Sequence, residues 1–304
     1  MINESSLSKE WIEELRSAEL YKKAHPELME KILEEIIASS SFTSFKCDEN
    51  RTFADGFPKA HYDIFYISKF DGAENNILLD VVFDEIPYPE IIEAPIKSVL
   101  LNTSEPDTTT KVPSINSLTG DKLTAFAPNT IGIKYNSNKD LQIIKQLFDL
   151  GRLFHVADDF NVVADSFNRI AATQLDYQKK DFSMDEILLD TINTSYLLAM
   201  QNKNKDDALL KYEELHSGVK KIPPFLPKPK YSMYNAIEDS AKAAFIAAKL
   251  LMNDYTHIEK IDKKDYDPNE FHITDGKYKA VTKMIKGMPN ISLYYWHQVS
   301  MLIN

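Results

Sequence analysis

Residues Ser117–Thr130 read SLTGDKLTAFAPNT and begin the long helical part of the chain. A helix that starts near Leu118 would place Lys122 on the same face as Leu118 and the apolar residues that follow. A lysine on an apolar face is unusual, because its charge must reach either water or a partner. Three interpretations remain open: Lys122 binds a phosphate, extends its amine to solvent, or pairs with Asp121 or Asp149.

Asp149 lies in KQLFDLGRLF, residues 145–154, where large apolar residues surround it. A helix that is apolar on most sides is largely buried, so an ionised carboxylate on it needs a partner. Lys145 and Arg152 lie four residues before and three residues after it, which would suit an exposed ladder of ion pairs. Lys122 is the other candidate partner.

The chain from residue 117 onward is mostly helical in its pattern. Apolar residues recur at spacings of three and four in the segments 140–157, 160–175, 184–200, 235–252 and 277–288. The N-terminal part differs because it contains strand-like runs. The sequence therefore predicts an α+β protein, with an α+β domain over residues 1–112, a helical domain over residues 113–304 and a boundary near residues 105–115.

The N-terminal part begins with two predicted helices between Leu7 and Ser39, and a polar stretch follows them. HYDIFYISKF, residues 61–70, alternates in the manner of a strand, and NNILLDVVFDEIPYP, residues 75–89, is apolar at its centre. DGAEN lies between the two runs and has the composition of a turn, which predicts an antiparallel hairpin. Three prolines end this strand section, and a loop-rich passage follows over residues 101–114.

Asp80 is embedded in ILLDVVFDE, residues 77–85, among neighbours that are expected to be buried. An ionised carboxylate in such a strand costs several kcal/mol unless it meets a cation or a metal. One interpretation is a metal-binding carboxylate on a central strand. The other is an acid on the exposed face of the sheet, because every second residue of a strand points outward. The sequence leaves both interpretations open.

The composition is that of an ordinary globular protein, with 43% hydrophobic and 27% charged residues. No apolar run is long enough for a membrane span, the polar N-terminus is unlike a secretory signal, and Cys47 is the single cysteine. These features favour a cytoplasmic protein without membrane contact. The net charge of −11 argues against a surface that binds nucleic acid throughout. Lys220, Lys221, Lys228 and Lys230 form either a local basic patch or a solvated, proline-rich connector.

Three segments carry a resemblance to a known family: ILLDVVFDE around Asp80, VPSINSLTGDKLTAFAPNT around Lys122, and IIKQLFDLGRLF around Asp149. Together they resemble the AbiEii/AbiGii family of toxin nucleotidyltransferases, from the toxin–antitoxin and abortive-infection systems of phage defence. The two helical motifs are fairly specific, whereas one acid on a strand is not. The resemblance extends over most of residues 9–170.

The resemblance implies a nucleotidyltransferase fold that moves a nucleoside monophosphate from an NTP to an acceptor such as tRNA. It also implies Mg²⁺, which neutralises charge on the triphosphate as pyrophosphate leaves. By position within the motifs, Asp80 is similar to a metal-binding acid, Lys122 to a lysine that contacts the triphosphate, and Asp149 to the acid of the last motif. Asp80 and Asp149 are thus the expected catalytic residues, and a cognate antitoxin-like protein is an expected partner.

One motif of the family is missing from this sequence. The family carries a Gly-Gly or Gly-Ser turn followed by Asp-x-Asp, but none of the eight glycines here is followed by Gly, Ser or Thr. Asp48, Glu49 and Asp55 lie nearby without that context. Ordinary nucleotidyl transfer is then expected to fail, which leaves a second hypothesis: an inactive family member that binds a nucleotide or a protein. A third is an unrelated helical binding protein.

Overall fold

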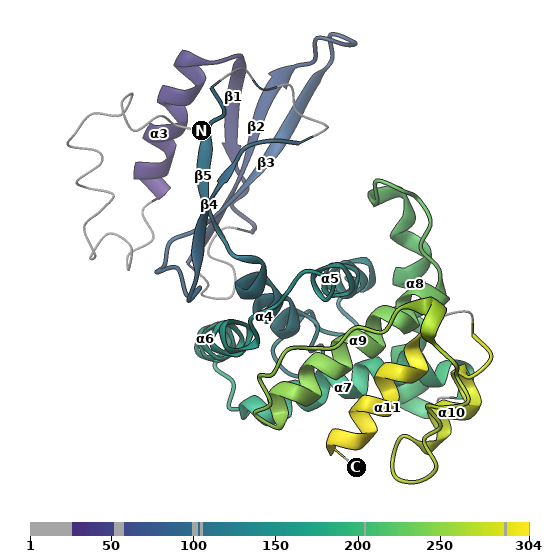
Figure 1. The fold of residues 1–304 in the computed structure, drawn as a ribbon. Coiled ribbons are helices and arrows are strands. Elements are labelled where there is room, and N and C mark those ends of the chain that lie inside the picture. Colours follow the sequence, from purple (N-terminus) through teal and green to yellow (C-terminus); the bar gives the residue numbers. More distant parts are fainter. Residues whose placement is uncertain are drawn as a thin grey trace. The chain divides into compact units, whose positions relative to one another are not determined.

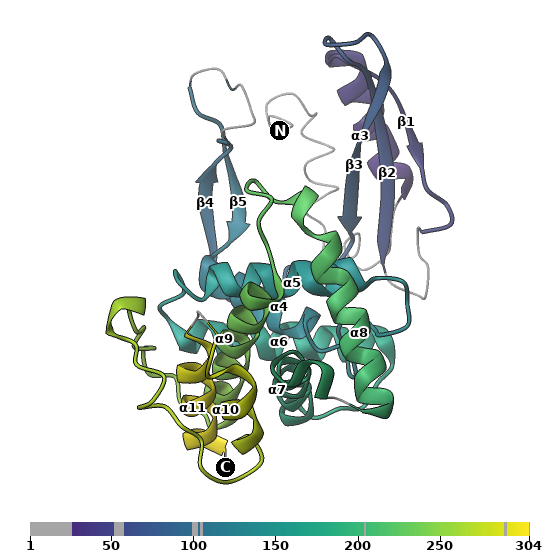
Figure 2. The same ribbon diagram turned by 90° about the vertical axis from the view of Figure 1, so that its right-hand side faces the viewer.

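The chain forms two compact units in the computed structural model, which describes residues 26–51, 58–98, 103, 106–203, 205–288 and 291–303. The first, here called the sheet unit, comprises the chain up to Ile86 together with Ile96–Thr110. The second, the helical unit, comprises Pro87–Pro95 and Lys111–Asn304. Figures 1 and 2 show the elements of both units from two directions. The first of the two expected N-terminal helices and Asp55 lie outside the described residues.

The sheet unit contains one described helix and a three-stranded antiparallel sheet in the order β1-β2-β3. These elements are α3 (Pro26–Ser39), β1 (Phe42–Cys47), β2 (Lys59–Ile67) and β3 (Glu74–Val82). The predicted hairpin is confirmed, because β2 and β3 pair along their whole length. Gly72 in the connecting turn has a φ of 70°, a conformation that glycine adopts without steric cost.

Alternation along the strands gives the sheet one covered face. Tyr62 and Ile64 of β2 are buried with Leu33 of α3, and their partners across the ladder are Leu79 and Ile77 of β3. Figure 2 shows α3 beside β1. The residues that alternate with these positions along the strands, such as Asp80, therefore point to the opposite face.

Two strand predictions need correction. The polar stretch after α3 contains β1, whose pairing with β2 supplies the stability that its own composition does not indicate. The passage expected to be rich in loops contains β5 (Thr109–Pro113), which pairs with β4 (Ile91–Pro95) in a separate two-stranded sheet. Both strands are short, and strand pairing depends on partners that lie far away in the sequence.

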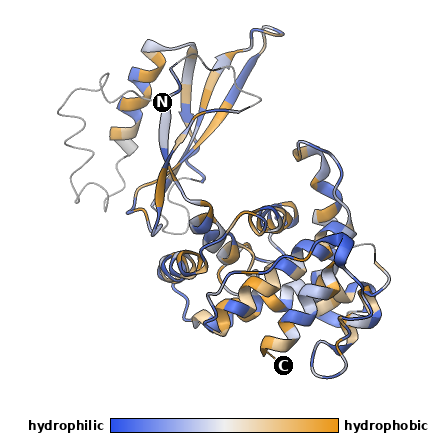
Figure 3. Cartoon of the chain, in the orientation of Figure 1, coloured by the Kyte–Doolittle hydropathy of each residue, from blue (hydrophilic) through white to orange (hydrophobic). Residues whose placement is uncertain are grey.

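The helical unit consists of helices packed around α9. Together with the sheet unit, these helices confirm the α+β class expected for the whole chain. The helices are α4 (Ile115–Ala125), α5 (Asp140–Leu153), α6 (Phe160–Gln178), α7 (Met184–Met200), α8 (Asp206–Lys221), α9 (Met233–Leu251), α10 (Lys279–Ile285) and α11 (Ser292–Ile303). Helix α9 contacts α5, α7 and α11, and the alanines along it let these neighbours approach closely. In Figure 3 most of these helices carry both hydrophobic and hydrophilic residues. None of the described helices is long and apolar enough to cross a membrane.

Two further expectations about helix ends differ from the structure. Helix α4 begins at Ile115 rather than near Leu118, because the Ser114 side chain accepts a hydrogen bond from the Ser117 N–H and caps the helix. Lys220 and Lys221 lie in the last turn of α8 rather than on a connector, and Lys221 pairs with Asp140 at 2.6 Å.

Candidate functional site

Lys122 and Asp149 meet across helices α4 and α5. Lys122 Nζ lies 2.9 Å from Asp149 Oδ2, and it also donates a hydrogen bond to Gln146 Oε1 at 3.0 Å. The Lys122 side chain is 26% exposed and the Asp149 side chain 41% exposed. The expected contact between the two charges is therefore present, at the margin of the core rather than inside it. Sequence reasoning missed Gln146, which lies one helical turn before Asp149.

The packing of α4 explains why Lys122 lies at that margin. The next residue, Leu123, is fully buried. Gly120 approaches α6 so closely that a Cβ on it would lie 2.5 Å from the Val163 carbonyl oxygen. Ser166 on α6 donates a hydrogen bond to the Ser117 carbonyl at 2.6 Å. These contacts fix the rotation of α4 about its axis, and that rotation directs Lys122 toward α5.

Asp121 has a different partner from the one that its position beside Lys122 suggested. Its carboxylate accepts a hydrogen bond from the Tyr88 hydroxyl at 2.9 Å. Burial raises the pKa of the Asp121 carboxyl, and the Tyr88 hydrogen bond and the Lys122 charge oppose that rise. The segment around Tyr88 is held further by Glu90, whose carbonyl accepts a hydrogen bond from Ser117 Oγ at 3.1 Å. Asp121 thus anchors the segment before β4.

Asp80 lies on the exposed face of the sheet, as one of the two sequence interpretations expected. Its side chain is 63% exposed, and its Oδ1 lies 2.5 Å from Nδ1 of His61, directly across the ladder. Asp80 belongs to the sheet unit, whereas Lys122 and Asp149 belong to the helical unit. Within the helical unit, the structure brings together Lys122 and Asp149.

The residues around Asp80 do not form a site for Mg²⁺. A Mg²⁺ ion that acts on a triphosphate is held by carboxylates in octahedral geometry, and two-metal transfer needs more than one such ligand. Within the described ranges, no three His, Cys, Asp or Glu residues are grouped so as to hold a metal ion. The side chain next to Asp80 is a histidine rather than a second acid. The described residues therefore do not fit the metal that the family resemblance implies.

A second group of charges, centred on Asp239 of α9, is more deeply buried than Lys122 and Asp149. Asp239 accepts hydrogen bonds from Arg152 at 3.0 Å and from the Tyr231 hydroxyl at 2.9 Å. Lys242 lies 3.6 Å from Asp239 and donates to Glu238 at 2.9 Å. Burial raises the pKa of Asp239, and the charges of Lys242 and Arg152 oppose the rise. Sequence reasoning missed this network.

Gly151 and His155 complete the surroundings of that network. A Cβ on Gly151 would lie 2.2 Å from the Asp239 carboxylate, so only glycine lets α5 and α9 pack this closely. His155 Nε2 lies 3.1 Å from Lys242 Nζ. Burial and the nearby charges of Lys242 and Arg152 lower the pKa of His155 to about 4. The imidazole is therefore neutral at physiological pH and is able to accept a hydrogen bond from the Lys242 amine.

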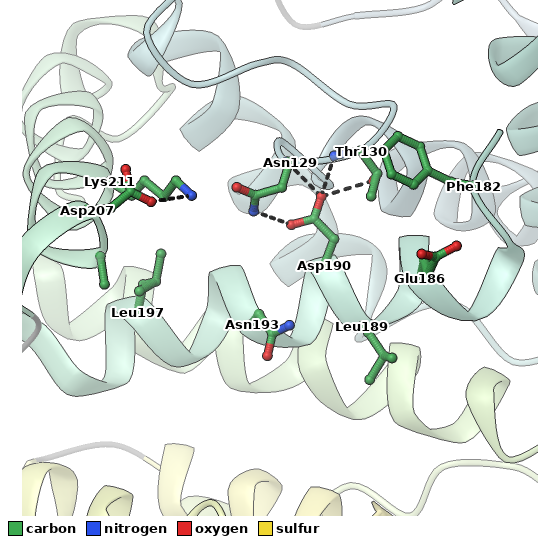
Figure 4. Close-up of a pocket in the computed structure, with 11 residues that line it drawn as sticks. Asn129, Thr130, Phe182, Glu186, Leu189, Asp190, Asn193, Leu197, Asp207 and Lys211 are labelled. Atoms are coloured by element: carbon green, nitrogen blue, oxygen red, sulfur yellow. Dashed lines mark hydrogen bonds and ion pairs between the residues drawn. The ribbon is translucent and has the colours of Figure 1, made fainter. Parts of the chain in front are cut away.

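An open pocket of about 500 Å³ lies between α7 and α8, beside the turn that follows α4 (Figure 4). Its buried acid, Asp190, accepts hydrogen bonds from the backbone N–H groups of Asn129 and Thr130 at 2.7 and 2.8 Å. The Thr130 hydroxyl adds a third at 3.0 Å. Asp190 thus fixes the turn at the end of SLTGDKLTAFAPNT, and this explains its burial without a ligand.

Lys122 and Asp149, from two helices, are thus the pair of motif residues in direct contact within the helical unit. The sequence matches the family described as "Nucleotidyl transferase AbiEii toxin, Type IV TA system" over residues 18–234, which is more than half of the chain. The chain therefore belongs to this toxin family, and the resemblance inferred from three motifs is confirmed. Asp80, Lys122 and Asp149 all lie within the matched region. Neither a curated protein nor a solved structure matches the sequence.

Proposed function

We propose that this chain is a toxin that binds an NTP through Lys122 and transfers a nucleotide from it to an acceptor such as tRNA. The observation that carries the proposal is the contact of Lys122 with Asp149 and Gln146 at the surface of the helical unit. A lysine amine has three N–H donors. The two contacts use two of them and hold the ammonium group in place, which leaves the third for a phosphate oxygen.

Asp149 has a positioning role in this proposal. A carboxylate beside Lys122 holds the ammonium group and prevents the long side chain from sampling other rotamers. Gln146 adds a neutral acceptor that holds the amine without adding negative charge that would repel the triphosphate. In this reaction Asp80 would be the strand acid that the family resemblance implies, and a cognate antitoxin would restrain the toxin in the cytoplasm, where NTPs and tRNA are present.

A second candidate function is favoured by two observations. The described residues do not fit a Mg²⁺ site, and no glycine of the sequence opens the Gly-Ser and Asp-x-Asp motif. An inactive member of the family would still bind a nucleotide or an antitoxin-like protein through the helical unit. An inactive member that binds a nucleotide would share the Lys122 subsite with the transferase and differ from it only in the transfer step.

The two candidates are separated by measuring transfer and binding in parallel. The wild-type chain and its Lys122→Ala, Asp149→Ala and Asp80→Ala variants are incubated with labelled NTPs, Mg²⁺ and total tRNA. The transferase proposal predicts label on the RNA that is lost in Lys122→Ala and Asp80→Ala. Binding is followed as the rise in melting temperature with NTP, which reports ligand affinity for the folded state. A rise that depends on Lys122, with no transfer, would favour the inactive candidate that binds a nucleotide, and no rise at all would reject nucleotide binding in both candidates.

Lys145→Ala is a matched control for the binding measurement. Lys145 lies on the same helix as Asp149, and its amine is 4.2 Å from the centre of the Phe225 ring. Loss of this charge changes the net charge by the same amount as Lys122→Ala without touching the pair. The proposal requires NTP binding to be weakened in Lys122→Ala and retained in Lys145→Ala.

A further inference from the structure

Strand β3 is an open edge of the three-stranded sheet. It pairs with β2 on one side, and no described strand pairs with its other side. Nearly the whole strand is exposed, including the apolar residues Ile77, Leu78 and Val82. Natural proteins protect such edges with lysine, proline or a bulge, because an exposed edge pairs readily with another chain. Over its nine residues, ENNILLDVV, β3 carries none of these protections.

The sequence of β3 is complementary to itself in one antiparallel register. When two copies are centred on Leu78, each Leu78 faces the other, and Ile77 of one copy faces Leu79 of the other. Asn76 then faces Asp80, an uncharged amide opposite a carboxylate, and Glu74 faces Val82. No two like charges lie opposite each other in this register. Cross-strand pairs of this kind are the units that stabilise a sheet.

The neighbouring strand β2 extends the same complementarity. Tyr62 lies opposite Leu79, and Ile64 lies opposite Ile77. In the paired copies, these residues would form an apolar row from Tyr62 through Leu79 to Ile77 and Ile64 of the second copy. Lys59 lies opposite Val82, and Val82 would face Glu74 of the second copy. The Lys59 amine and that glutamate would therefore lie on either side of β3. The apolar face and the charges thus match in the same register.

Other registers that keep each side chain on its own face match less well. Centring on Leu79 would place the charged Asp80 opposite Leu78 beside the two-fold axis, whereas the register centred on Leu78 has its charged–apolar pair, Glu74 with Val82, at the ends of the strands. Centring on Asp80 would place two carboxylates opposite each other, which is destabilising. A shift by a single residue would put the covered side chains on the exposed face. The register centred on Leu78 is therefore favoured over its neighbours.

We infer that β3 is a docking surface for a second copy of this chain, with the two strands paired antiparallel about a two-fold axis at Leu78. Such an interface uses the same patch on both partners, as two-fold dimers do. The result is a continuous six-stranded sheet in which both copies present α3 on the same face. This interface does not depend on the proposed transfer reaction.

The first experiment tests the register by the sign of a charge at Val82. Val82→Glu would place a glutamate opposite Glu74 of the second copy, twice in each dimer, and Val82→Lys would place a lysine there. Within one chain, Val82→Glu is expected to fold more stably than Val82→Lys, because position 82 lies opposite Lys59. The order for the stability of the fold is thus the reverse of the order expected for the dimer. Sedimentation of the full chain over a concentration series is expected to show a dimer for the wild type. The dissociation constant is expected to be at least about tenfold larger for Val82→Glu than for Val82→Lys.

The matched control is Leu210, an exposed residue of α8. Leu210 is 64% exposed and Val82 is 62% exposed. Leu210→Glu and Leu210→Lys are expected to leave the dissociation constant unchanged relative to each other. A wild-type chain that stays monomeric at every concentration overturns the inference, because the edge is then covered by something other than a second copy. Equal or reversed dissociation constants for the two Val82 variants also overturn it.

The second experiment seeks a covalent dimer. Directly opposite residues of an antiparallel pair have Cα atoms about 4.5–5.5 Å apart, within the range of a disulfide. Leu78→Cys is therefore expected to form a disulfide-linked dimer under mild oxidation, whereas Leu210→Cys is expected to remain a monomer on a non-reducing gel. Leu78 is 67% exposed, close to the exposure of Leu210. The wild-type chain measures the background from Cys47, and cross-linking no greater than this background contradicts the two-fold axis at Leu78.

Discussion

The sheet unit and the helical unit accommodate their charged residues in different ways. Asp80 of the sheet unit has an exposed carboxylate that contacts His61 across one strand pair. Asp239 and Lys242 of the helical unit are each 1% exposed and are surrounded by partners from α5 and α9. A carboxylate withdrawn from water needs several donors, and crossing helices supply them from several directions. A sheet with one covered face leaves its outer charges to water.

The hydrophobic cores of the two units differ in size. Among the described residues of the sheet unit, the core cluster has four buried members, Leu33, Ala60, Tyr62 and Ile64. In the helical unit the buried cluster includes residues from every helix from α4 to α11. A small core contributes little stability, so the sheet unit has more to gain from a partner along its open edge.

The largest expected effect comes from breaking the buried network of the helical unit. Asp239→Ala removes the acceptor of Arg152 and Tyr231 and leaves Lys242 buried with one fewer counter-charge. Loss of one partner from a buried pair costs about 3–5 kcal/mol. Urea unfolding followed by helical circular dichroism measures the change in unfolding free energy.

Asp165→Ala is the control for that measurement. Asp165 forms an exposed pair with Arg169 on α6 at 2.8 Å, and exposed pairs contribute about 0–1 kcal/mol. Similar losses of stability in Asp239→Ala and Asp165→Ala would show that burial of the network adds nothing, and the contrast between the two units would lose its basis.

A cavity in the small core is expected to unfold the sheet unit alone. Leu33 is fully buried between α3 and the sheet, and Leu→Ala substitutions at such positions cost about 2–5 kcal/mol. In Leu33→Ala, amide hydrogens of β2 should exchange faster while those of α9 keep their protection. Leu147→Ala, at a buried position of α5, is expected to give the opposite pattern, with faster exchange in α9 and retained protection in β2. Loss of protection in both units from Leu33→Ala would indicate that the units unfold together.

Acid is expected to weaken the helical unit through His155. Its pKa is lowered to about 4 by burial and by Lys242, Arg152 and Lys260, with Glu238 opposing them. The folded chain therefore binds fewer protons than the unfolded chain between about pH 6.5 and pH 4, and stability falls as the pH falls through this window. His155→Gln removes the titrating group, so its stability should fall less over the same range. Equal slopes for the wild type and this variant would contradict the lowered pKa.

The sequence predicted the elements that depend on local patterns. The spacing of apolar residues indicated most helices, and the unusual positions of Lys122 and Asp149 made their contact one of the open alternatives. The face on which Asp80 lies stayed open, because alternation along a strand does not show which face is covered. The Asp239 network was missed because Arg152 is distant from Asp239 in the chain, and the crossing of α5 with α9 brings the two together.

The smallest expected effect on stability belongs to the pair that is proposed to bind the nucleotide. Lys122 and Asp149 are partly exposed, so Lys122→Met should change the unfolding free energy by no more than about 1 kcal/mol, while the rise in melting temperature with NTP should disappear. A loss as large as that of Asp239→Ala would instead make Lys122 a structural residue of the α4–α5 contact. A small change in unfolding free energy, together with a complete loss of the rise in melting temperature with NTP, distinguishes a binding residue from a packing residue. In that case the fold is retained, and what is lost is the charge proposed to face the phosphate.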